Sequence, residues 1–257
     1  MLCGQPTQGD AMVDEARVDL GPGAWVTARR YDGGPPPLAA LVLAHGAGAS
    51  QASDFMVTYA SGLASRGLTV VTFNFPFTER GRKLPDPQPV LEACYRAVLE
   101  LVASDAATGA LPLFIGGKSL GGRMASHVAA TGTEMGEAGG GWWDRLRGLV
   151  FLGYPLHPPG RPQQVRVSHL PRIIHPMLVV QGAKDAFGTP AELRLFFDVL
   201  PAPAEVYVVE QGGHSLEVPK RSGRVQMEVN AGVQDRIAAW IRERLGSSSD
   251  VERRPRP

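Results

Sequence analysis

Short apolar runs alternate along this chain with longer segments whose apolar residues recur every three or four positions. Short, nearly continuous apolar runs are typical of parallel strands buried on both faces, and the longer spacing is typical of amphipathic helices. We expect strands at 14–19, 23–30, 38–44, 68–73, 111–115, 148–152, 177–180 and 205–210, and helices at 54–65, 89–102, 190–200 and 234–245. This alternation predicts an α/β fold, a doubly wound, mostly parallel sheet of about eight strands flanked by helices.

The segment 89–102 shows the helical spacing most clearly. Its apolar residues recur at Val90, Cys94, Ala97, Val98 and Leu101, and we expect this face to pack on the core. Cys94 is then a small buried residue. The chain has only two cysteines, so we expect no disulfide framework.

The amino-acid composition is typical of a globular protein. The chain has 257 residues, 44% of them hydrophobic, and a formal net charge of +1, which gives no reason to expect nucleic acid or an acidic membrane as partner. We expect one domain at 12–245, between a disordered N-terminus at 1–11 and a disordered tail at 246–257. No stretch reaches the roughly 20 apolar residues of a membrane span, and no signal peptide is evident. The expected location is cytoplasmic, and the oligomeric state stays open.

One hexapeptide carries the clearest chemical signal. Residues 117–122 read Gly-Lys-Ser-Leu-Gly-Gly directly after the apolar run 111–115. The pattern G-x-S-x-G between a strand and a helix predicts a nucleophile elbow, in which small residues permit a strained turn that exposes the hydroxyl of Ser119. A serine is a weak nucleophile at neutral pH, so a base and an orienting acid are required.

The acid and the base are expected on turns after later strands, in the order serine, acid, histidine. Asp185 follows the strand at 177–180, and His214 follows the strand at 205–210. Between Arg145 and Lys184 there is no Asp or Glu, so Asp185 is the first acid available. Alone, Asp185 would be a turn or helix-capping residue and His214 a polar loop residue; together with Ser119 they predict a catalytic triad.

An oxyanion hole needs two backbone N–H groups. We expect one from Leu120, directly after the serine, and the other from Ala47, with Gly46 as the next choice. His45 is expected to brace that turn. Gly-Lys-Ser also resembles the end of a phosphate-binding loop, but that motif needs a glycine where this chain has Pro112. No His, Cys or carboxylate cluster has metal-ligand spacing, so we expect no metal or other cofactor.

These motifs resemble a branch of the α/β-hydrolases related to dienelactone hydrolases, often called testis-expressed-protein-like or non-specific-lethal-complex-subunit-like hydrolases. The resemblance rests on residues 45–49, 73–77, 116–123, 153–160, 181–188 and 213–215. It implies a serine hydrolase, although one eukaryotic relative serves in a chromatin-associated complex. The insertion at 136–143 and the extended tail depart from the pattern and concern surface contacts.

Two functions follow from these observations. The first is hydrolysis of a small ester-type substrate (carboxylester, thioester or lactone), and the alternative is an interaction module that kept the hydrolase fold. The connection 153–175 has five prolines and leaves room for only a minimal cap, which favours short, water-soluble substrates. Candidate substrate contacts are Lys118, Arg123, Phe75, Tyr154 and His157.

Basic residues near these motifs raise a further possibility for the substrate. They are Arg80, Arg82, Lys83, Lys118, Arg123, Arg145, Arg147, Arg161, Arg166, Arg172 and Lys184. One interpretation is a set of solvated surface charges. The other is an electropositive rim that attracts an anionic substrate.

Overall fold

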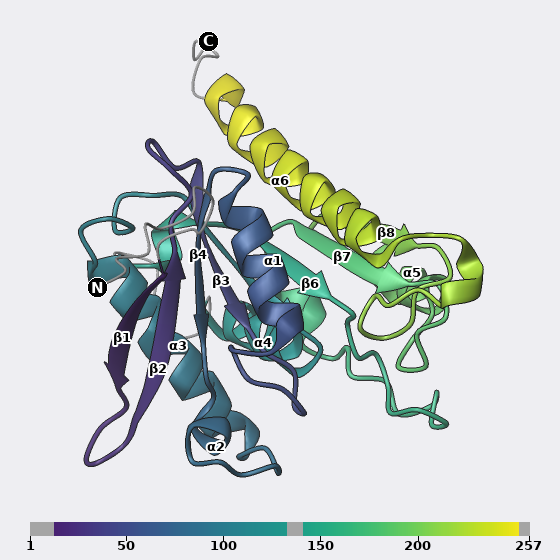
Figure 1. The fold of residues 1–257 in the computed structure, drawn as a ribbon, viewed down its shortest axis with the longest axis horizontal. Helices are drawn as coiled ribbons and strands as arrows, with labels where there is room; N and C mark the ends of the chain where they lie inside the picture. The colour runs from purple at the N-terminus through teal and green to yellow at the C-terminus, as the bar shows by residue number, and fades with distance from the viewer. Residues whose placement is uncertain (1–12, 133–140, 252–257) are drawn as a thin grey trace, which may run out of the picture.

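The computed structural model describes residues 13–132 and 141–251. Eight strands form one sheet in the order β1-β2-β4-β3-β5-β6-β7-β8, as Figure 1 shows. The strands are β1 (Val13–Asp19), β2 (Trp25–Tyr31), β3 (Ala39–Ala44), β4 (Leu68–Phe73), β5 (Leu113–Lys118), β6 (Leu146–Leu152), β7 (Met177–Gly182) and β8 (Ala204–Val209). Pairing is antiparallel for β1 with β2 and β2 with β4 and parallel elsewhere. The predicted doubly wound, mostly parallel sheet is confirmed.

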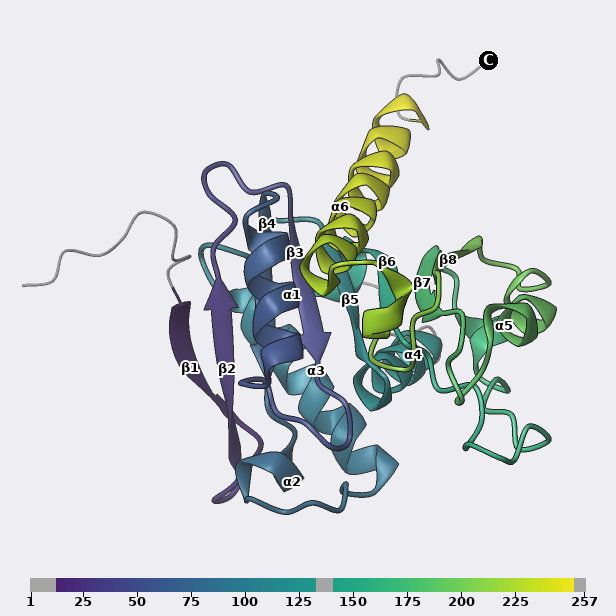
Figure 2. The same ribbon diagram turned by 45° about the vertical axis from the view of Figure 1, so that its right-hand side comes forward.

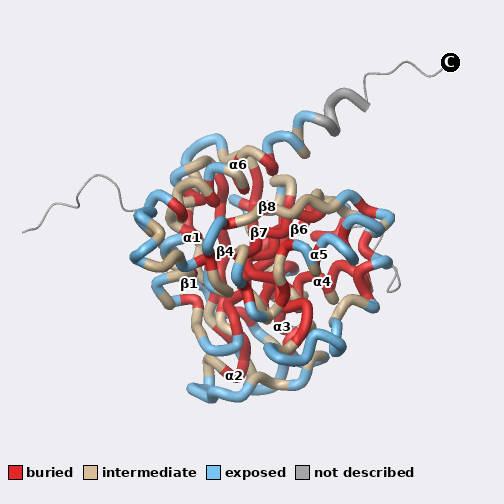
Figure 3. Tube along the Cα trace, turned by 90° about the vertical axis from the view of Figure 1, so that its right-hand side faces the viewer, coloured by how far each residue is buried: buried red, intermediate tan, exposed pale blue. Residues whose placement is uncertain are grey.

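Helices cover both faces of the sheet. On one face lie α1 (Asp54–Ala64) and α6 (Gln226–Val251), and on the other α3 (Gln88–Ser104), α4 (Leu120–Gly132) and α5 (Pro190–Phe197). Figure 2 shows α1 and α3 on opposite sides of the strands. Successive residues of β3 belong in turn to the apolar cluster on one face of the sheet and to the cluster on the other face, because successive side chains of a strand point to opposite faces. Figure 3 shows the buried segments gathered along the central strands.

The remaining elements are short. They are α2 (Pro76–Glu79) and the 3₁₀ turns η1 (Trp143–Arg145), η2 (Leu170–Arg172) and η3 (Lys220–Ser222). Within the described ranges, none of the helices is long and apolar enough to cross a bilayer. The expected cytoplasmic location stays a prediction.

Two expectations about helices are wrong in detail. In α3 the expected residues Cys94 and Val98 are buried, but Val90 is 42% exposed. Leu91, Tyr95 and Leu99 are buried as well, so the buried face is shifted by one residue from part of the expected one. The last helix begins at Gln226 and extends to Val251, so 246–251 are helical where a disordered tail was expected. Its first turn is polar and is held by hydrogen bonds of Gln226 to Leu216 and Val218, which an apolar pattern does not reveal.

Other expectations concern segments that are only partly described. Residues 1–11 and 252–257, expected to be disordered, lie outside the described residues, and so do positions 136–140 of the insertion. The two tryptophans that end this insertion, Trp142 and Trp143, are buried in the core. The ring of Trp143 packs against His175 and occupies the space beside Gly132.

The pairing of the parallel strands brings their carboxyl ends to one edge of the sheet. Ala44 pairs with Gly117, Lys118 with Leu152, and Gly182 with Val209. Below this edge, the buried hydroxyl of Tyr95 lies 2.7 Å from the Gly116 carbonyl oxygen and accepts the Gly116 N–H at 3.0 Å. The turns after β3, β5, β6, β7 and β8 therefore meet in one place, which is where open α/β sheets form their sites.

Four buried or half-buried histidines make the stability of this fold depend on pH. Burial lowers the pKa of His45, His127 and His175 to about 4 and that of His169 to about 3. Between these values and about 6.5 the unfolded chain takes up protons that the folded chain excludes. The free energy of unfolding should therefore fall as the pH drops from 6.5 towards 4, by up to about 1.4 kcal/mol per pH unit for each histidine.

His175→Phe tests this dependence with little other disturbance, because the buried Nδ1 of His175 has no hydrogen-bond partner among the described residues. Urea denaturation at pH 4.5 to 7 gives the free energy of unfolding at each pH. In the variant, the slope of this free energy against pH should be smaller than in the wild type by the equivalent of up to one proton. The free energy of unfolding at pH 7 should be no lower than that of the wild type. An unchanged slope would contradict the assignment.

Candidate active site

Ser119 is the single residue between β5 and α4 and has a φ of 50°. A left-handed backbone is uncommon for a residue with a side chain and marks a strained turn. Glycines make the turn possible, because a Cβ on Gly117 or Gly121 would lie 2.3 or 2.1 Å from the carbonyl oxygen of Ala44. The Ser119 N–H donates to the Leu152 carbonyl at 3.0 Å. The elbow is thus pressed against β3 and tied to β6.

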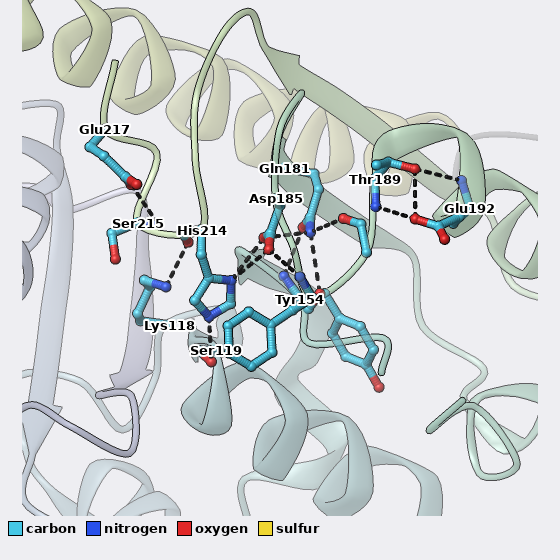
Figure 4. Close-up of polar contacts among 12 residues, drawn as sticks. Lys118, Ser119, Tyr154, Gln181, Asp185, Thr189, Glu192, His214, Ser215 and Glu217 are labelled. Atoms are coloured by element: carbon cyan, nitrogen blue, oxygen red, sulfur yellow. Dashed lines mark hydrogen bonds and ion pairs between the residues drawn. The ribbon is translucent and has the colours of Figure 1, made fainter. Parts of the chain in front are cut away.

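An unbroken hydrogen-bond chain joins the three residues predicted from the sequence. Ser119 Oγ lies 2.8 Å from His214 Nε2, and His214 Nδ1 lies 2.8 and 3.0 Å from the two carboxylate oxygens of Asp185, as Figure 4 shows. A carboxylate facing Nδ1 keeps the proton on that nitrogen and leaves Nε2 as the acceptor. This arrangement directs the imidazole lone pair at the serine hydroxyl.

Asp185 is buried and held by groups besides the histidine. Its Oδ2 accepts a hydrogen bond from Gln181 Nε2 and its Oδ1 one from the Phe187 N–H, each at 2.8 Å. Gln181 is itself fully buried, and its Oε1 accepts the N–H of Tyr154. The sequence interpretation missed Gln181; its signal is a lone amide at the end of an otherwise apolar strand.

The turn after β3 forms the other wall of the site. The Phe75 N–H donates to His45 Nε2 at 3.1 Å, and His45 Nδ1 lies 2.7 Å from the Gly46 carbonyl oxygen. His45 therefore braces this turn, as predicted. Among the described residues, the N–H groups of Ala47 and Leu120 donate no hydrogen bond, and both residues border the same cavity. The two groups expected to form an oxyanion hole are thus unoccupied donors beside Ser119.

A cavity of about 410 Å³ opens above the serine. It is lined by Gly46, Ala47, Gly48, Ala49, Lys118, Ser119, Leu120, Arg123, Pro155, Arg166, Phe187, His214 and Ser215. The Phe187 ring stacks on the His214 imidazole with ring centres 4.1 Å apart. Phe187, Pro155 and Ser215 border the cavity without having been predicted to do so.

Three of the predicted substrate contacts do not border this cavity. Phe75 is buried against the ring of His45, and Tyr154 is buried with its hydroxyl 3.3 Å from the Arg166 carbonyl oxygen. His157 is 5% exposed and lies 3.6 Å from Glu192. These expectations are corrected: the three side chains support the loops around the site, whereas Lys118 and Arg123 line the cavity.

The expected electropositive rim is also narrower than the sequence indicated. Arg80 and Arg82 pair with Asp86, and Arg145 and Arg147 bind backbone carbonyls near the start of β6, at the opposite edge of the sheet. The cationic side chains that line the cavity are Lys118, Arg123 and Arg166, and no Asp or Glu is among the lining residues that the structure describes.

A second serine–histidine contact lies away from the cavity. Ser126 Oγ is 2.7 Å from His169 Nε2, but both residues are buried, and the His169 ring stacks on His127 with ring centres 3.6 Å apart. No carboxylate contacts His169 among the hydrogen bonds of the described residues. This pair has neither access for a substrate nor an orienting acid, so it does not compete with Ser119.

The connection after β6 bears on access to the site. Residues 153–175 contain a single short turn, η2, among their regular elements. No cap domain is therefore inserted at this point, as the prolines of the segment predicted.

Comparison with known proteins gives one family and many similar folds. Residues 37–242 match the family described as "Alpha/beta hydrolase domain". A dienelactone hydrolase from Anabaena variabilis is 18% identical with a TM-score of 0.69, covering 91% of this chain and 98% of its own. Est1E from Butyrivibrio proteoclasticus, solved with ferulic acid bound, is 14% identical with a TM-score of 0.70, covering 90% and 99%. An α/β serine hydrolase without a lid from Xanthomonas campestris is 18% identical with a TM-score of 0.63, covering 89% and 94%.

Replacing Gln181 by leucine tests how the acid is held. The change leaves the buried N–H of Tyr154 and the buried carbonyl of Gly188 without their amide partner, and each orphaned buried group costs about 1–3 kcal/mol. Asp185 Oδ2 loses one hydrogen bond but keeps its contact with His214 Nδ1. We expect the free energy of unfolding at pH 7 to fall by about 2–4 kcal/mol in urea denaturation. Gln163→Leu, at an exposed position, should change it by less than about 0.5 kcal/mol. Equal stability of the two variants would contradict this role.

Proposed function

This chain belongs to the alpha/beta hydrolase family, and we propose that it is a serine hydrolase that cleaves small ester-type substrates through Ser119, His214 and Asp185. The observation that carries the proposal is the hydrogen-bond chain from Ser119 Oγ to the buried carboxylate. Carboxylesters, thioesters and lactones share the acyl carbon that such a serine attacks. We place the chain in the dienelactone-hydrolase-related branch that includes the testis-expressed-protein-like hydrolases, on the motifs that it shares with them.

The proposed reaction has two stages. Ser119 Oγ attacks the acyl carbon while His214 Nε2 takes the hydroxyl proton, and Asp185 stabilises the imidazolium that forms. The negative charge on the former carbonyl oxygen is held by the N–H groups of Leu120 and Ala47. The imidazolium then gives its proton to the leaving oxygen or sulfur, and an acyl-enzyme remains. Water attacks this ester with His214 again as base, and Ser119 regains its proton.

The size and access of the cavity support a small, water-soluble substrate. A volume of about 410 Å³ is at the lower end of the range for small-molecule sites. Nothing between residues 153 and 175 forms a cap of its own beyond one short turn. The proposed substrate can therefore reach Ser119 without displacing a lid.

Ser119→Ala should abolish hydrolysis of para-nitrophenyl acetate, because the other parts of the triad cannot replace the nucleophile. Stability should be nearly unchanged, since the hydroxyl is half-exposed and contributes little packing. Ser126→Ala is the matched control; it removes the other serine hydroxyl that contacts an imidazole and should keep most of the activity. A Ser119 variant retaining more than about a tenth of kcat would refute the nucleophile.

A fluorophosphonate probe separates this proposal from the alternative, a non-catalytic interaction module. The wild-type protein should be labelled at one serine, and the Ser119 and His214→Ala variants should not be labelled on brief exposure. A folded wild-type protein that resists the probe would favour the interaction module.

We further propose that the substrate carries a negative charge. Arg123 stands one helical turn beyond Ser119, and burial together with the neighbouring Arg166 lowers its pKa. The Arg123 Nε is buried without a hydrogen-bond partner among the described residues, while its Nη2 donates to Gln88 Oε1 at 2.9 Å. The Arg166 guanidinium makes no hydrogen bond or ion pair with any described residue. Glu92 offsets part of the repulsion between the two cations at Arg123, but no Asp or Glu is among the described residues that line the cavity. An anionic group on the substrate would relieve the remaining repulsion.

A matched pair of esters tests this charge preference. The para-nitrophenyl monoester of succinic acid should have a higher kcat/KM than para-nitrophenyl butyrate, and the advantage should shrink as ionic strength rises. Arg166→Gln should lower kcat/KM for the anionic ester roughly tenfold, because a hydrogen bond between charged groups is worth about 1.5 kcal/mol or more. It should leave the butyrate ester within about twofold.

Arg161→Gln is the control, since Arg161 is exposed on the same connection and does not border the cavity. Equal losses on both esters, or an equal loss in the Arg161 variant, would assign the effect to something other than the charge at the cavity.

A further inference from the structure

Lys118, the residue directly before the proposed nucleophile, reaches three of the other turns that build the site. Its Nζ lies 2.7 Å from the carbonyl oxygen of His214, the base itself. Its stem passes Gly46, where a Cβ would lie 3.6 Å from Lys118 Cγ, and its Nζ would lie 3.3 Å from a Cβ on Gly153. Figure 4 shows the amine directed at the His214 main chain. One side chain therefore connects the elbow with the turns after β3, β6 and β8.

The position is unusual for a lysine, because the residue is only 7% exposed. Burying an ammonium group is costly unless hydrogen bonds and opposite charges compensate it. Here the compensation comes from the His214 carbonyl, from the face of the Phe55 ring at 5.7 Å, and from the carboxylates of Asp185 and Glu217. Because this buried cation contacts the main chain of the proposed base, we looked to His214 for its role.

We propose that Lys118 is a positioning residue whose ammonium group clamps the loop of His214 against the nucleophile elbow, so that the base engages Ser119 fully only while Lys118 is charged. The inference rests on the hydrolase activity proposed above. The clamped atom belongs to the main chain from which the imidazole extends, so movement of this carbonyl moves the ring. A displacement of about 1 Å in a catalytic group can cost up to 100-fold in rate.

The loop has features that make such a clamp effective. Gln211 and Leu216 have φ values of 63° and 60°, conformations that residues with side chains adopt only when their surroundings enforce them. Within the loop, Glu217 accepts the Ser215 N–H, whereas two hydrogen bonds tie His214 to the elbow, one from Lys118 to its carbonyl and one between its imidazole and Ser119. Without it, this tie is reduced to the Ser119–His214 hydrogen bond, which the reaction itself must break.

Protonation of Lys118 gives the clamp a measurable signature. Burial lowers its pKa to about 8, although the facing carboxylates Asp185 and Glu217 act in the opposite direction; the other titratable group that faces it is His214. The ammonium is therefore lost as the pH rises through about 8. A neutral amine makes a weaker hydrogen bond than a charged one, so kcat should decline over the same range.

Stability should move the opposite way. In the unfolded chain a lysine keeps its proton up to a pKa of about 10.4, so between about pH 8 and 10 the unfolded state binds more protons than the folded state. The contribution of Lys118 to the free energy of unfolding then rises with pH. A fall in activity accompanied by this gain in stability separates the clamp from simple alkaline unfolding.

The experiment compares wild type, Lys118→Met and Lys118→Arg from pH 6 to 10 with para-nitrophenyl acetate. Wild-type kcat should fall several-fold between pH 7.5 and 9.5. Lys118→Met should lose roughly 10- to 100-fold of kcat at pH 7 with KM within about twofold, and its profile should be flat at alkaline pH. Lys118→Arg keeps the cation and should move the alkaline decline upward by more than one pH unit. Lys184→Met, at an exposed lysine beside Asp185, should behave as wild type.

Hydrogen exchange of the amides of 211–217 gives a readout that does not depend on activity. Lys118→Met should raise their exchange about tenfold and leave the amides of β3 and β5 unchanged. If Lys118→Met does not fold, the Lys118→Arg profile decides. The proposal is overturned if an active wild type shows no alkaline decline, if the decline stays at the same pH in Lys118→Arg, or if Lys118→Met keeps more than half of kcat. If the wild-type protein hydrolyses no ester, the proposed function is wrong, and this result does not test the clamp. In that case, unchanged hydrogen exchange in Lys118→Met would refute the clamp.

Discussion

The close approach of the elbow to the end of β3 is the constraint on which the site depends. Both Gly117 and Gly121 lie so near the Ala44 carbonyl that a Cβ at either position would overlap it. This contact fixes the height of Ser119 above the sheet and also its distance from the turn at 45–48, which follows Ala44 directly. The nucleophile and the proposed oxyanion donors are therefore placed by one backbone contact. The parallel register then sets where the turns of Asp185 and His214 can reach them.

Around that contact, the polar side chains fall into two groups that differ in what they bind. His45 and Gln181 are fully buried, and they bind backbone groups and the Asp185 carboxylate. Lys118, Arg123 and Arg166 border the cavity and carry charge. The first group satisfies buried donors and acceptors that would otherwise destabilise the fold. The second group sets the electric field at the place where negative charge would develop in the proposed acyl transfer.

The sequence predicted the sheet and the positions of Ser119, Asp185 and His214 because these depend on local patterns: apolar runs, a glycine-flanked serine, and polar residues directly after strands. It predicted the face of α3 only in part, since Cys94 and Val98 are buried as expected but tertiary packing places Leu91 and not Val90 in the core. Phe75, Tyr154 and His157 were expected at the substrate because they lie in motif segments. Motif membership does not distinguish a side chain that lines a cavity from one that supports it from below.

The same limit applies to charge. Eleven basic residues lie near the motifs in the sequence. Nearness in sequence does not place a guanidinium group at the cavity, because the long side chain can bind another partner. Arg80 pairs with Asp86 and Arg145 binds the Thr108 carbonyl. Arg123 is different because its helix starts at the elbow and its guanidinium borders the cavity, although its Nη2 also donates to Gln88 Oε1 at 2.9 Å and Glu92 lies near enough to raise its pKa. His127 and His169, which stack nearby, have lowered pKa values to which Arg123 contributes after burial itself. Burial is the main reason that these imidazoles are neutral, and the positive charge of Arg123 acts in the same direction. A carboxylate on the proposed substrate would bring an opposite charge to a cavity that no described Asp or Glu lines. If the substrate is anionic as proposed, the site would discriminate by charge before it discriminates by shape, because the electrostatic field extends further than contact.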